Sequence, residues 1–145
     1  MRSDRPDAEA RPQIVGQRFP RSARLRTAGE FRRVYGRGTR AHGRLMVVVA
    51  LPRRDGHRLG LAVSKEHGTA VRRNKLKRIL REAFRMERAS LRGAFDLILI
   101  PRRSEGRMLL REVRRELAEL VARLADKDPG RRRAKHRRDR EADPS

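Results

Sequence analysis

The sequence contains no cysteine and no tryptophan, and aromatic residues make up only 3% of its 145 positions. The absence of cysteine excludes disulfide scaffolds, thiolate metal sites and cysteine nucleophiles. No apolar run approaches the roughly 20 residues that span a bilayer, and Met1–Pro6 lacks the apolar core of a signal peptide. We therefore expect a soluble, cytoplasmic protein without a membrane partner. Hydrophobic residues, at 37%, still allow one small core.

Acidic residues are scarce beside basic ones, with 18 Asp and Glu against 40 Lys and Arg, for a net charge of +22. Residues 18–126 hold 29 of the basic and 11 of the acidic residues, so the excess belongs to the part of the chain that can fold. Such a charge predicts a polyanionic partner, usually nucleic acid. Of the basic residues, 35 are Arg and 5 are Lys. This bias suits bidentate phosphate contacts, although a GC-rich genome would explain it equally well.

Composition divides the chain into a central domain, residues 18–126, and two arms. Residues 1–17 have no hydrophobic period and residues 127–145 form a basic tail, so both arms are predicted to be disordered. Hydrophobic periodicity in the domain predicts three helices and three strands. In chain order these are a helix from Thr27 to about Gly36, strands at 45–51 and 58–63, a helix at 69–88, a strand at 94–100 and a helix at 107–124.

Local signals mark where these elements begin and turn. Thr27 and Glu30 have the spacing of a capping box, which starts the first helix. The turn sequence at 52–56 separates the first two strands, so they are predicted to form a hairpin. The order αββαβα, with room for one extra strand, predicts an α+β fold, a two-layer α/β sandwich.

The predicted helix at 69–88 has an apolar face and an opposite face of cations. A rotation of about 100° per residue puts four polar residues opposite the apolar side. They are Asn74, Arg78, Arg81 and Arg85, and Arg73, Lys75 and Lys77 flank them. Like charges at these spacings repel, so either solvent or an external anion must offset the repulsion. Because few carboxylates lie nearby, we interpret the stripe as a phosphate-binding face.

Two of the five aromatic residues, Phe31 and Tyr35, share one face of the first helix among arginines. They are interpreted either as ordinary packing against the sheet or as a platform on which unpaired bases stack.

Residues for catalysis by the protein itself are missing. The histidines at 42, 57, 67 and 136 are scattered without metal-ligand spacing, and no phosphate-binding loop occurs. Asp96 lies in a predicted strand and is expected to be a buried structural acid. No metal site and no catalytic side chain is therefore predicted.

Residues 63–82, which read VSKEHGTAVRRNKLKRILRE, closely resemble the signature of the bacterial ribonuclease P protein component. Residues 24–39 resemble the N-terminal helix region of that family, and the similarity spans about 18–125. The resemblance implies an α/β sandwich with a left-handed βαβ crossover. It also implies a small subunit of an enzyme whose catalytic RNA removes the 5′ leader of precursor tRNA, with Mg²⁺ held mainly by the RNA.

Carried onto this chain, the resemblance assigns catalytic-RNA binding to seven residues of the central helix. They are Arg72, Arg73, Asn74, Lys75, Lys77, Arg78 and Arg81. It assigns leader binding to Phe31 and Tyr35, with Lys65 at the basic edge of the cleft. Three departures reduce this match. Lys75 stands where Arg is usual, Glu66 stands where a second lysine is frequent, and the first strand reads MVVV at 46–49 where relatives often offer aromatics to the leader.

Other functions stay open on the sequence alone. They are a ribosomal or other structured-RNA-binding protein with a similar sandwich, a protein-only nuclease and, more weakly, a DNA-binding protein. The motif at 63–82 favours the ribonuclease P subunit because it is far more specific than a basic helix. The expected partners are the catalytic RNA and precursor tRNA, and no protein oligomer is predicted.

Overall fold

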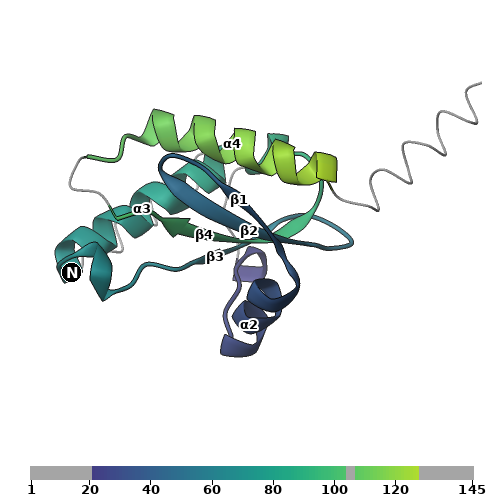
Figure 1. The fold of residues 1–145 in the computed structure, drawn as a ribbon, viewed down its shortest axis with the longest axis horizontal. Helices are drawn as coiled ribbons and strands as arrows, with labels where there is room; N and C mark the ends of the chain where they lie inside the picture. Colours follow the sequence, from purple (N-terminus) through teal and green to yellow (C-terminus); the bar gives the residue numbers. More distant parts are fainter. Residues whose placement is uncertain (1–20, 104–106, 128–145) are drawn as a thin grey trace, which may run out of the picture.

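The computed structural model describes residues 21–103 and 107–127, which form one four-stranded sheet with helices on both faces (Figure 1). Both predicted arms lie outside the described residues, apart from Lys127, which ends a helix. The helices are α2 (Ala28–Arg37), α3 (Ala70–Glu87) and α4 (Leu110–Lys127), with 3₁₀ turns η2 (Arg21–Ala23), η3 (Lys65–His67) and η4 (Arg88–Ser90). The strands are β1 (Thr39–His42), β2 (Met46–Pro52), β3 (Arg58–Leu61) and β4 (Phe95–Pro101).

Helix α2 begins and ends where the sequence predicts. The Thr27 hydroxyl accepts a hydrogen bond from the Glu30 N–H at 3.1 Å, and the Glu30 carboxylate accepts one from the Thr27 N–H at 3.1 Å, which completes the capping box. At the other end the Gly38 N–H donates to the Val34 carbonyl at 2.8 Å. A Cβ at Gly38 would lie 2.5 Å from that oxygen, so only glycine fits this exit from the helix.

The predicted hairpin between residues 45–51 and 58–63 is wrong. The strand order is β1-β2-β4-β3, so β4 lies between the two strands that were expected to pair. Strand β2 instead pairs antiparallel with β1, the extra strand, and all seven of its residues also pair with β4. The turn residues at 52–56 reverse the direction of the chain, but they do not determine which strand pairs with β2. The two seven-residue strands β2 and β4 pair along their whole length, whereas a partner of four residues, such as β3, would leave part of β2 unpaired.

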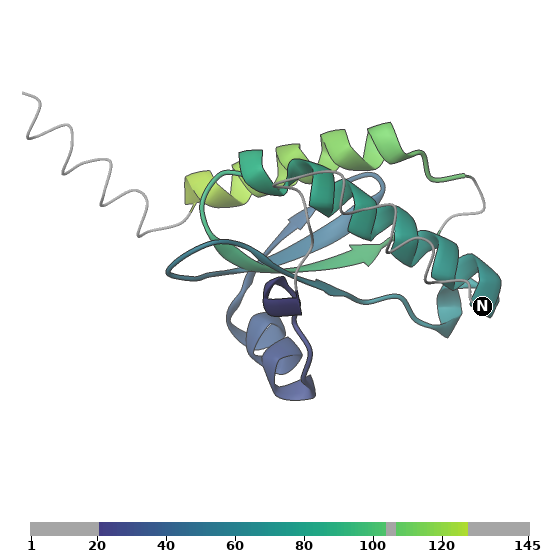
Figure 2. The ribbon, with the colours of Figure 1, turned by 180° about the vertical axis from the view of Figure 1, so that it is seen from behind.

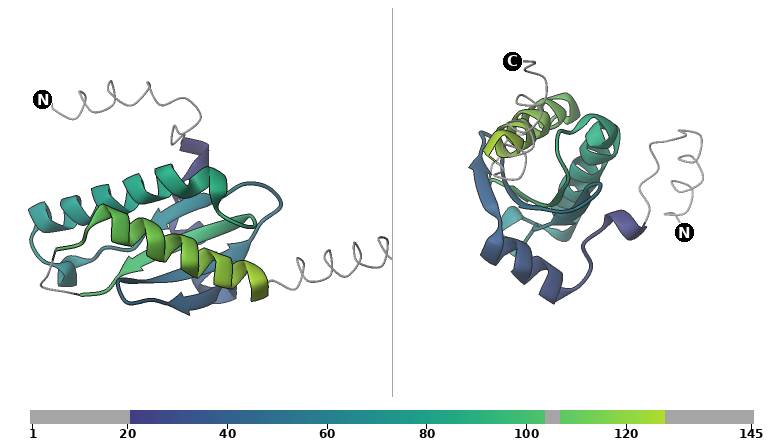
Figure 3. Two further views of the ribbon diagram at one scale, coloured as in Figure 1. Left: turned by 90° about the horizontal axis from the view of Figure 1, so that it is seen from above. Right: turned by 90° about the vertical axis from the view of Figure 1, so that its right-hand side faces the viewer.

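Strands β3 and β4 are parallel neighbours joined through α3, which is the crossover unit that the resemblance implies. The parallel register runs from Arg58 opposite Asp96 to Leu61 opposite Leu99. Figures 2 and 3 show α3 and α4 side by side over one face of the sheet and α2 on the opposite face. The α+β fold class is therefore confirmed, but the layers number three and not the predicted two, because Val49 and Ile98 give the second face of the sheet its own apolar contact with α2.

Alternate residues of the central strands face the two helical layers. Val48, Ala50, Leu97 and Leu99 are buried in the main core beneath α3 and α4. Val49 and Ile98 belong to a second cluster beneath α2. Strands covered on both faces read as continuous apolar runs, which is why β2 and β4 show no polar alternation.

The two long helices differ in how well the sequence predicts their ends. Thr69 caps α3, with its hydroxyl accepting from the Arg72 N–H at 3.2 Å, as expected. Helix α4 begins at Leu110, three residues later than predicted, and runs to Lys127. Leu109 directly precedes the helix, and neither it nor Arg107 or Met108 is a preferred cap residue, so no local signal marks this start.

Candidate nucleic-acid interface

The outer side of α3 carries the cations that were predicted to contact RNA. The helix buries Leu80, Ala83 and Phe84 completely against the sheet and α4. None of the seven predicted residues is buried. Arg72, Asn74, Lys75, Arg78 and Arg81 are exposed, and Arg73 and Lys77 are half-buried. The structure therefore places all seven on one helix with surface available to a partner.

Most of these cations have no carboxylate to neutralise them. Within the part of the chain that the structure describes, Lys75, Lys77, Arg78 and Arg81 form no ion pair. Desolvation and the neighbouring Arg24 guanidinium lower the pKa of Arg81, although the group stays charged at neutral pH. A cation crowded by a second cation is stabilised by any anion that approaches.

Arg85 does not belong to this face, which corrects the prediction. Its side chain is buried, and its Nε donates to the Glu82 carboxylate at 3.0 Å. This hydrogen bond raises the pKa of Arg85. Helical spacing of three residues brings the two side chains together, so Arg85 is neutralised within the helix.

The connection from β3 into α3 is fastened to the end of β4. The Ser64 N–H donates to His67 Nδ1 at 3.0 Å, which leaves the ring proton on Nε2 to be donated to the Pro101 carbonyl at 2.7 Å. Gly68 follows with φ +114°, a conformation that side chains rarely adopt. Its carbonyl accepts from Arg73 Nε at 3.3 Å. The first turn of the cationic helix is thus held in a fixed place.

Phe31 and Tyr35 lie on the side of α2 that meets the sheet, and each is half-buried. The Phe31 ring packs on the backbone of β3, since a Cβ at Gly60 would lie 2.8 Å from two ring carbons. The Arg40 guanidinium lies 5.7 Å from the Tyr35 ring centroid, within reach of a cation–π contact. Both rings therefore contribute to packing and also keep exposed surface, so the packing interpretation is confirmed and base stacking stays a prediction.

The apolar surface beneath α2 continues to a cavity of about 420 Å³ at the ends of β3 and β4. Ala62 and Ile100 line this cavity and also pack against the same cluster as Phe31 and Tyr35. Lys65 is exposed on η3, between two residues that line the cavity. Sequence reasoning named the rings and the lysine but missed this sheet surface, because its half-buried residues read as ordinary strand.

An ionic network fixes α2 to the sheet. Arg58 Nε and Nη2 donate to the two oxygens of Asp96 at 2.7 and 2.9 Å, and Arg58 Nη1 donates to Glu30 at 3.2 Å. Asp96 is buried, as predicted, and its hydrogen bond is the main cause that raises the pKa of Arg58. Backbone N–H groups of Arg26 and Thr27, together with Arg58, lower the pKa of Glu30.

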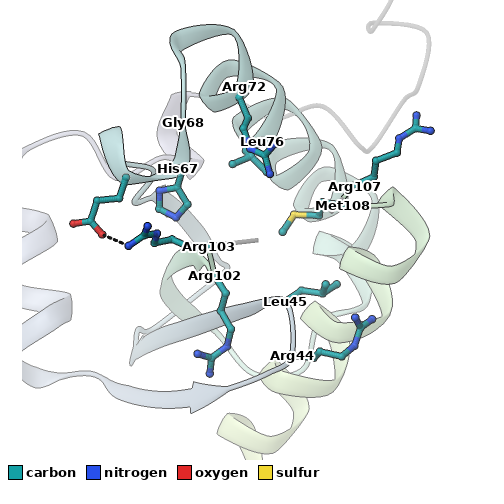
Figure 4. A pocket seen from close by; sticks show the side chains of 11 residues that line it. Arg44, Leu45, His67, Gly68, Arg72, Leu76, Arg102, Arg103, Arg107 and Met108 are labelled. Carbon is teal, nitrogen blue, oxygen red and sulfur yellow. Dashed lines mark ion pairs between the residues drawn. The ribbon is translucent and has the colours of Figure 1, made fainter. Parts of the chain in front are cut away.

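A larger cavity of about 970 Å³ lies on the other face of the sheet, and sequence reasoning missed it (Figure 4). Its lining comes from the β1–β2 turn, η3, α3, the end of β4 and the approach to α4. Residues so far apart in sequence carry no shared pattern. Five of the lining side chains are arginines: Arg44, Arg72, Arg102, Arg103 and Arg107.

Glu116 of α4 holds one wall of this cavity. Its carboxylate accepts hydrogen bonds from the backbone N–H groups of Arg44, Leu45 and Met46 at 2.9, 2.8 and 2.9 Å. Gly43 permits the approach, since a Cβ there would lie 2.5 Å from the Glu116 carboxyl. One side chain therefore fixes the β1–β2 turn against α4.

Metal-binding and membrane features are not found among residues 21–103 and 107–127. No group of three His, Cys, Asp or Glu side chains in these ranges could hold a metal ion. In the same ranges no helix has the length and apolarity to traverse a bilayer.

Comparison with known proteins decides the family. The sequence matches the family described as Ribonuclease P over residues 19–125. The chain belongs to the ribonuclease P protein family. It is 38% identical to the ribonuclease P protein component of Desulfovibrio desulfuricans over 117 residues, covering 77% of this chain and 90% of that protein. The match confirms the resemblance carried by residues 63–82.

Solved ribonuclease P proteins have the same fold. The protein from Thermotoga maritima superposes with a TM-score of 0.62 at 33% identity, covering 69% of this chain and 96% of that one. The protein from Staphylococcus aureus gives 0.60 at 33% identity, with coverages of 69% and 93%. The chain is thus a ribonuclease P component of the tRNA-processing enzyme, which implies an RNA partner.

Proposed function

We propose that the chain binds the catalytic RNA of ribonuclease P through the outer side of α3. The observation that carries the proposal is the set of seven polar residues on this one helix, none of them buried and most of them cationic without a paired carboxylate. Arginine and lysine there would screen the repulsion between RNA phosphates that approach each other closely. Lys75 provides charge, but without the planar fork that gives arginine its bidentate geometry.

On the opposite face, the 5′ leader of precursor tRNA would lie along Phe31, Tyr35 and the sheet surface that leads to Lys65. Half-buried rings with an exposed edge can stack on unpaired bases while their packed side fixes their orientation. The exposed arginines of α2 and its flanks would meet the leader phosphates. Two surfaces on opposite faces let one small protein hold the catalytic RNA and the substrate together.

In this proposal the hydrolysis of the precursor is performed by the RNA, and Mg²⁺ is held mainly by RNA. The chain's own part is binding and orientation. It would place the leader relative to the catalytic RNA and reduce the Mg²⁺ concentration that the complex needs.

Reconstitution tests this function. The full chain mixed with the catalytic RNA should restore cleavage of precursor tRNA at low Mg²⁺. Arg78→Ala and Arg81→Ala should each weaken RNA binding and lower the slope of log affinity against log salt by about one contact, or roughly 0.7–0.9. Arg54→Ala, in the exposed turn between β2 and β3, removes the same charge and should leave the slope unchanged. Unchanged slopes in all three variants would show that the α3 face is only solvated.

A further inference from the structure

We propose that the cavity between the β1–β2 turn, η3, α3 and the approach to α4 takes one unpaired nucleotide of the partner RNA. The base would enter the cavity and its flanking phosphates would lie on the arginines at the rim. This inference rests on the proposed function, because it assigns a specific subsite to the RNA that α3 binds.

The lining combines an apolar interior with a cationic rim. Leu45, Leu76 and Met108 provide the apolar surface, and Figure 4 shows Leu45 and Met108 directed toward the centre of the cavity. Five arginines stand around them, and two of these form exposed ion pairs: Arg103 with Glu66 at 3.9 Å and Arg44 with Glu112 at 3.8 Å. Glu66 is the one carboxylate among the lining residues, so the rim keeps an excess of positive charge. A base has apolar faces and carries phosphates on either side, so its chemistry matches both parts of the lining.

Several contacts hold this lining in place before any ligand arrives. Arg102 Nε donates to the Gly43 carbonyl at 2.7 Å, and Glu116 holds the N–H groups of Arg44 and Leu45. On the other wall Gly68, with its φ of +114°, lies against the Arg72 side chain. A site organised in advance loses less conformational entropy when it binds.

Size and charge select this occupant. A volume of about 970 Å³ lies in the range of small-ligand sites and has room for a base with its sugar and phosphates. The net charge of +22 also favours a polyanionic occupant over a second copy of this chain, which the same arginines would repel. Paired bases inside a helix are stacked on their neighbours and cannot enter, so the nucleotide must be unpaired.

The cavity is also continuous with the proposed RNA-binding face. Arg72 lines it and belongs to the seven residues of α3, so an RNA strand on α3 passes its mouth. Arginine suits this position because its guanidinium plane can stack on a base and also bind a phosphate bidentately.

The main test fills the cavity without changing its charge. The catalytic RNA of ribonuclease P is titrated with the full chain carrying Met108→Trp or, as the matched control, Leu109→Trp. Leu109 is 38% exposed, adjacent in sequence and absent from the lining, so it receives the same ring outside the cavity. Met108→Trp should weaken binding about fivefold or more, the loss expected for one displaced base, and Leu109→Trp should change it less than twofold. Equal affinities of the two variants, with equal melting temperatures, would overturn the proposal.

A second measurement does not depend on how Met108→Trp folds. The chain has no cysteine, so Leu109→Cys and Arg54→Cys each accept a single iron chelate that cleaves nearby RNA. Cleavage from residue 109 should centre on unpaired nucleotides of the catalytic RNA, and cleavage from residue 54, near the start of β4, should not reach them. Cleavage from residue 109 only within paired RNA would overturn the proposal.

The outcomes separate this inference from the proposed function. If the wild-type chain fails to activate the catalytic RNA, the proposed function falls. If it activates normally while Met108→Trp binds RNA as tightly as Leu109→Trp, only the nucleotide subsite falls. Competition by a polyglutamate peptide against wild type but not against Met108→Trp, with unchanged RNA affinity, would assign the cavity to an acidic protein segment instead.

Discussion

The two faces of the sheet differ in how completely helices cover them. Beneath α3 and α4 the main core contains 18 buried hydrophobic residues, whereas the cluster beneath α2 contains 4. The larger core fixes α3 as a rigid platform whose cations point outward. The smaller one leaves Phe31, Tyr35, Ala62 and Ile100 partly open. The face covered by α3 and α4 thus presents cations on a fully packed helical layer. The face covered by α2 presents apolar surface that α2 leaves partly uncovered.

The largest effect should come from breaking the main core. Phe84→Ala removes a fully buried ring of α3 and should lower the free energy of unfolding by about 3–5 kcal/mol. Val34→Ala, beneath α2, should cost only about 2 kcal/mol because it removes two methyl groups. Urea unfolding measures both values. Val71→Ala is the control, since Val71 is 78% exposed and its loss should change stability by less than about 0.5 kcal/mol.

A larger loss of unfolding free energy for Phe84→Ala than for Val34→Ala would show that the core beneath α3 and α4 stabilises the fold more than the cluster beneath α2. Equal costs for Phe84→Ala and Val34→Ala would mean that α2 supports the fold as strongly as α3 does. The distinction between a rigid platform and a half-open surface would then be wrong.

A smaller effect is expected from the aromatic pair. If Phe31 and Tyr35 stack on leader bases, Tyr35→Ala should weaken precursor tRNA binding by the holoenzyme by about 1–3 kcal/mol and leave mature tRNA unaffected. Phe31→Ala should do the same and also lower stability, because its ring packs on Gly60. Paired titrations with leader-bearing and mature tRNA, run beside thermal melts, measure both effects. Equal losses for the two tRNAs would assign both rings to the core alone.

The smallest effects should be losses of stability on acidification. The loss linked to His57 should begin at a higher pH than the loosening of α2 linked to Glu30. His57 is buried, and desolvation lowers its pKa despite hydrogen bonds with Leu91 and Phe95, while Arg53 and Arg88 add repulsion. The unfolded chain takes up a proton near pH 6.5 and the folded chain does not, so the free energy of unfolding should fall as pH drops below about 6.5. His57→Gln should abolish this dependence.

Glu30 should respond only at lower pH. Its folded pKa lies below the usual value, so its contribution is complete above about pH 4.5 and is lost as pH falls through the folded pKa. Fluorescence from a dye placed on α2 should therefore report loosening only in this lower range, and Glu30→Gln should remove the step. A step that persists in Glu30→Gln would assign it to another carboxylate.

Elements set by residues close together in sequence were predicted correctly from the sequence. Features set by residues far apart in sequence were not. Thr27 and Thr69 each cap a backbone N–H only three residues further along the chain, so the starts of both helices were predicted correctly. The partner of β2 lies about 50 residues further along the chain, and a turn motif cannot specify it. Similarly, Arg85 was assigned to the cationic face because its helical position was read without its bond to Glu82.

The candidate site likewise has parts that the sequence predicts and parts that it does not. The cations of α3 and the rings of α2 each lie on one continuous helix, so spacing alone collects them. Both cavities and the Glu30–Arg58–Asp96 network join residues from several elements, and no period connects them. Only the family resemblance suggested that Lys65 belongs near the rings.

The central position of β4 has a consequence for the order in which the protein can be made. Strand β4 is the last strand to leave the ribosome, yet β2 and β3 meet only through it. Until residues 95–101 emerge, the nascent chain holds an apolar β2 with one open edge and a β3 whose pairing is limited to the bridge between Arg24 and Leu59. Such edges invite pairing with other chains. Synthesis must therefore pass through a stage at which about two-thirds of the chain has left the ribosome while the strand that joins β2 to β3 has not.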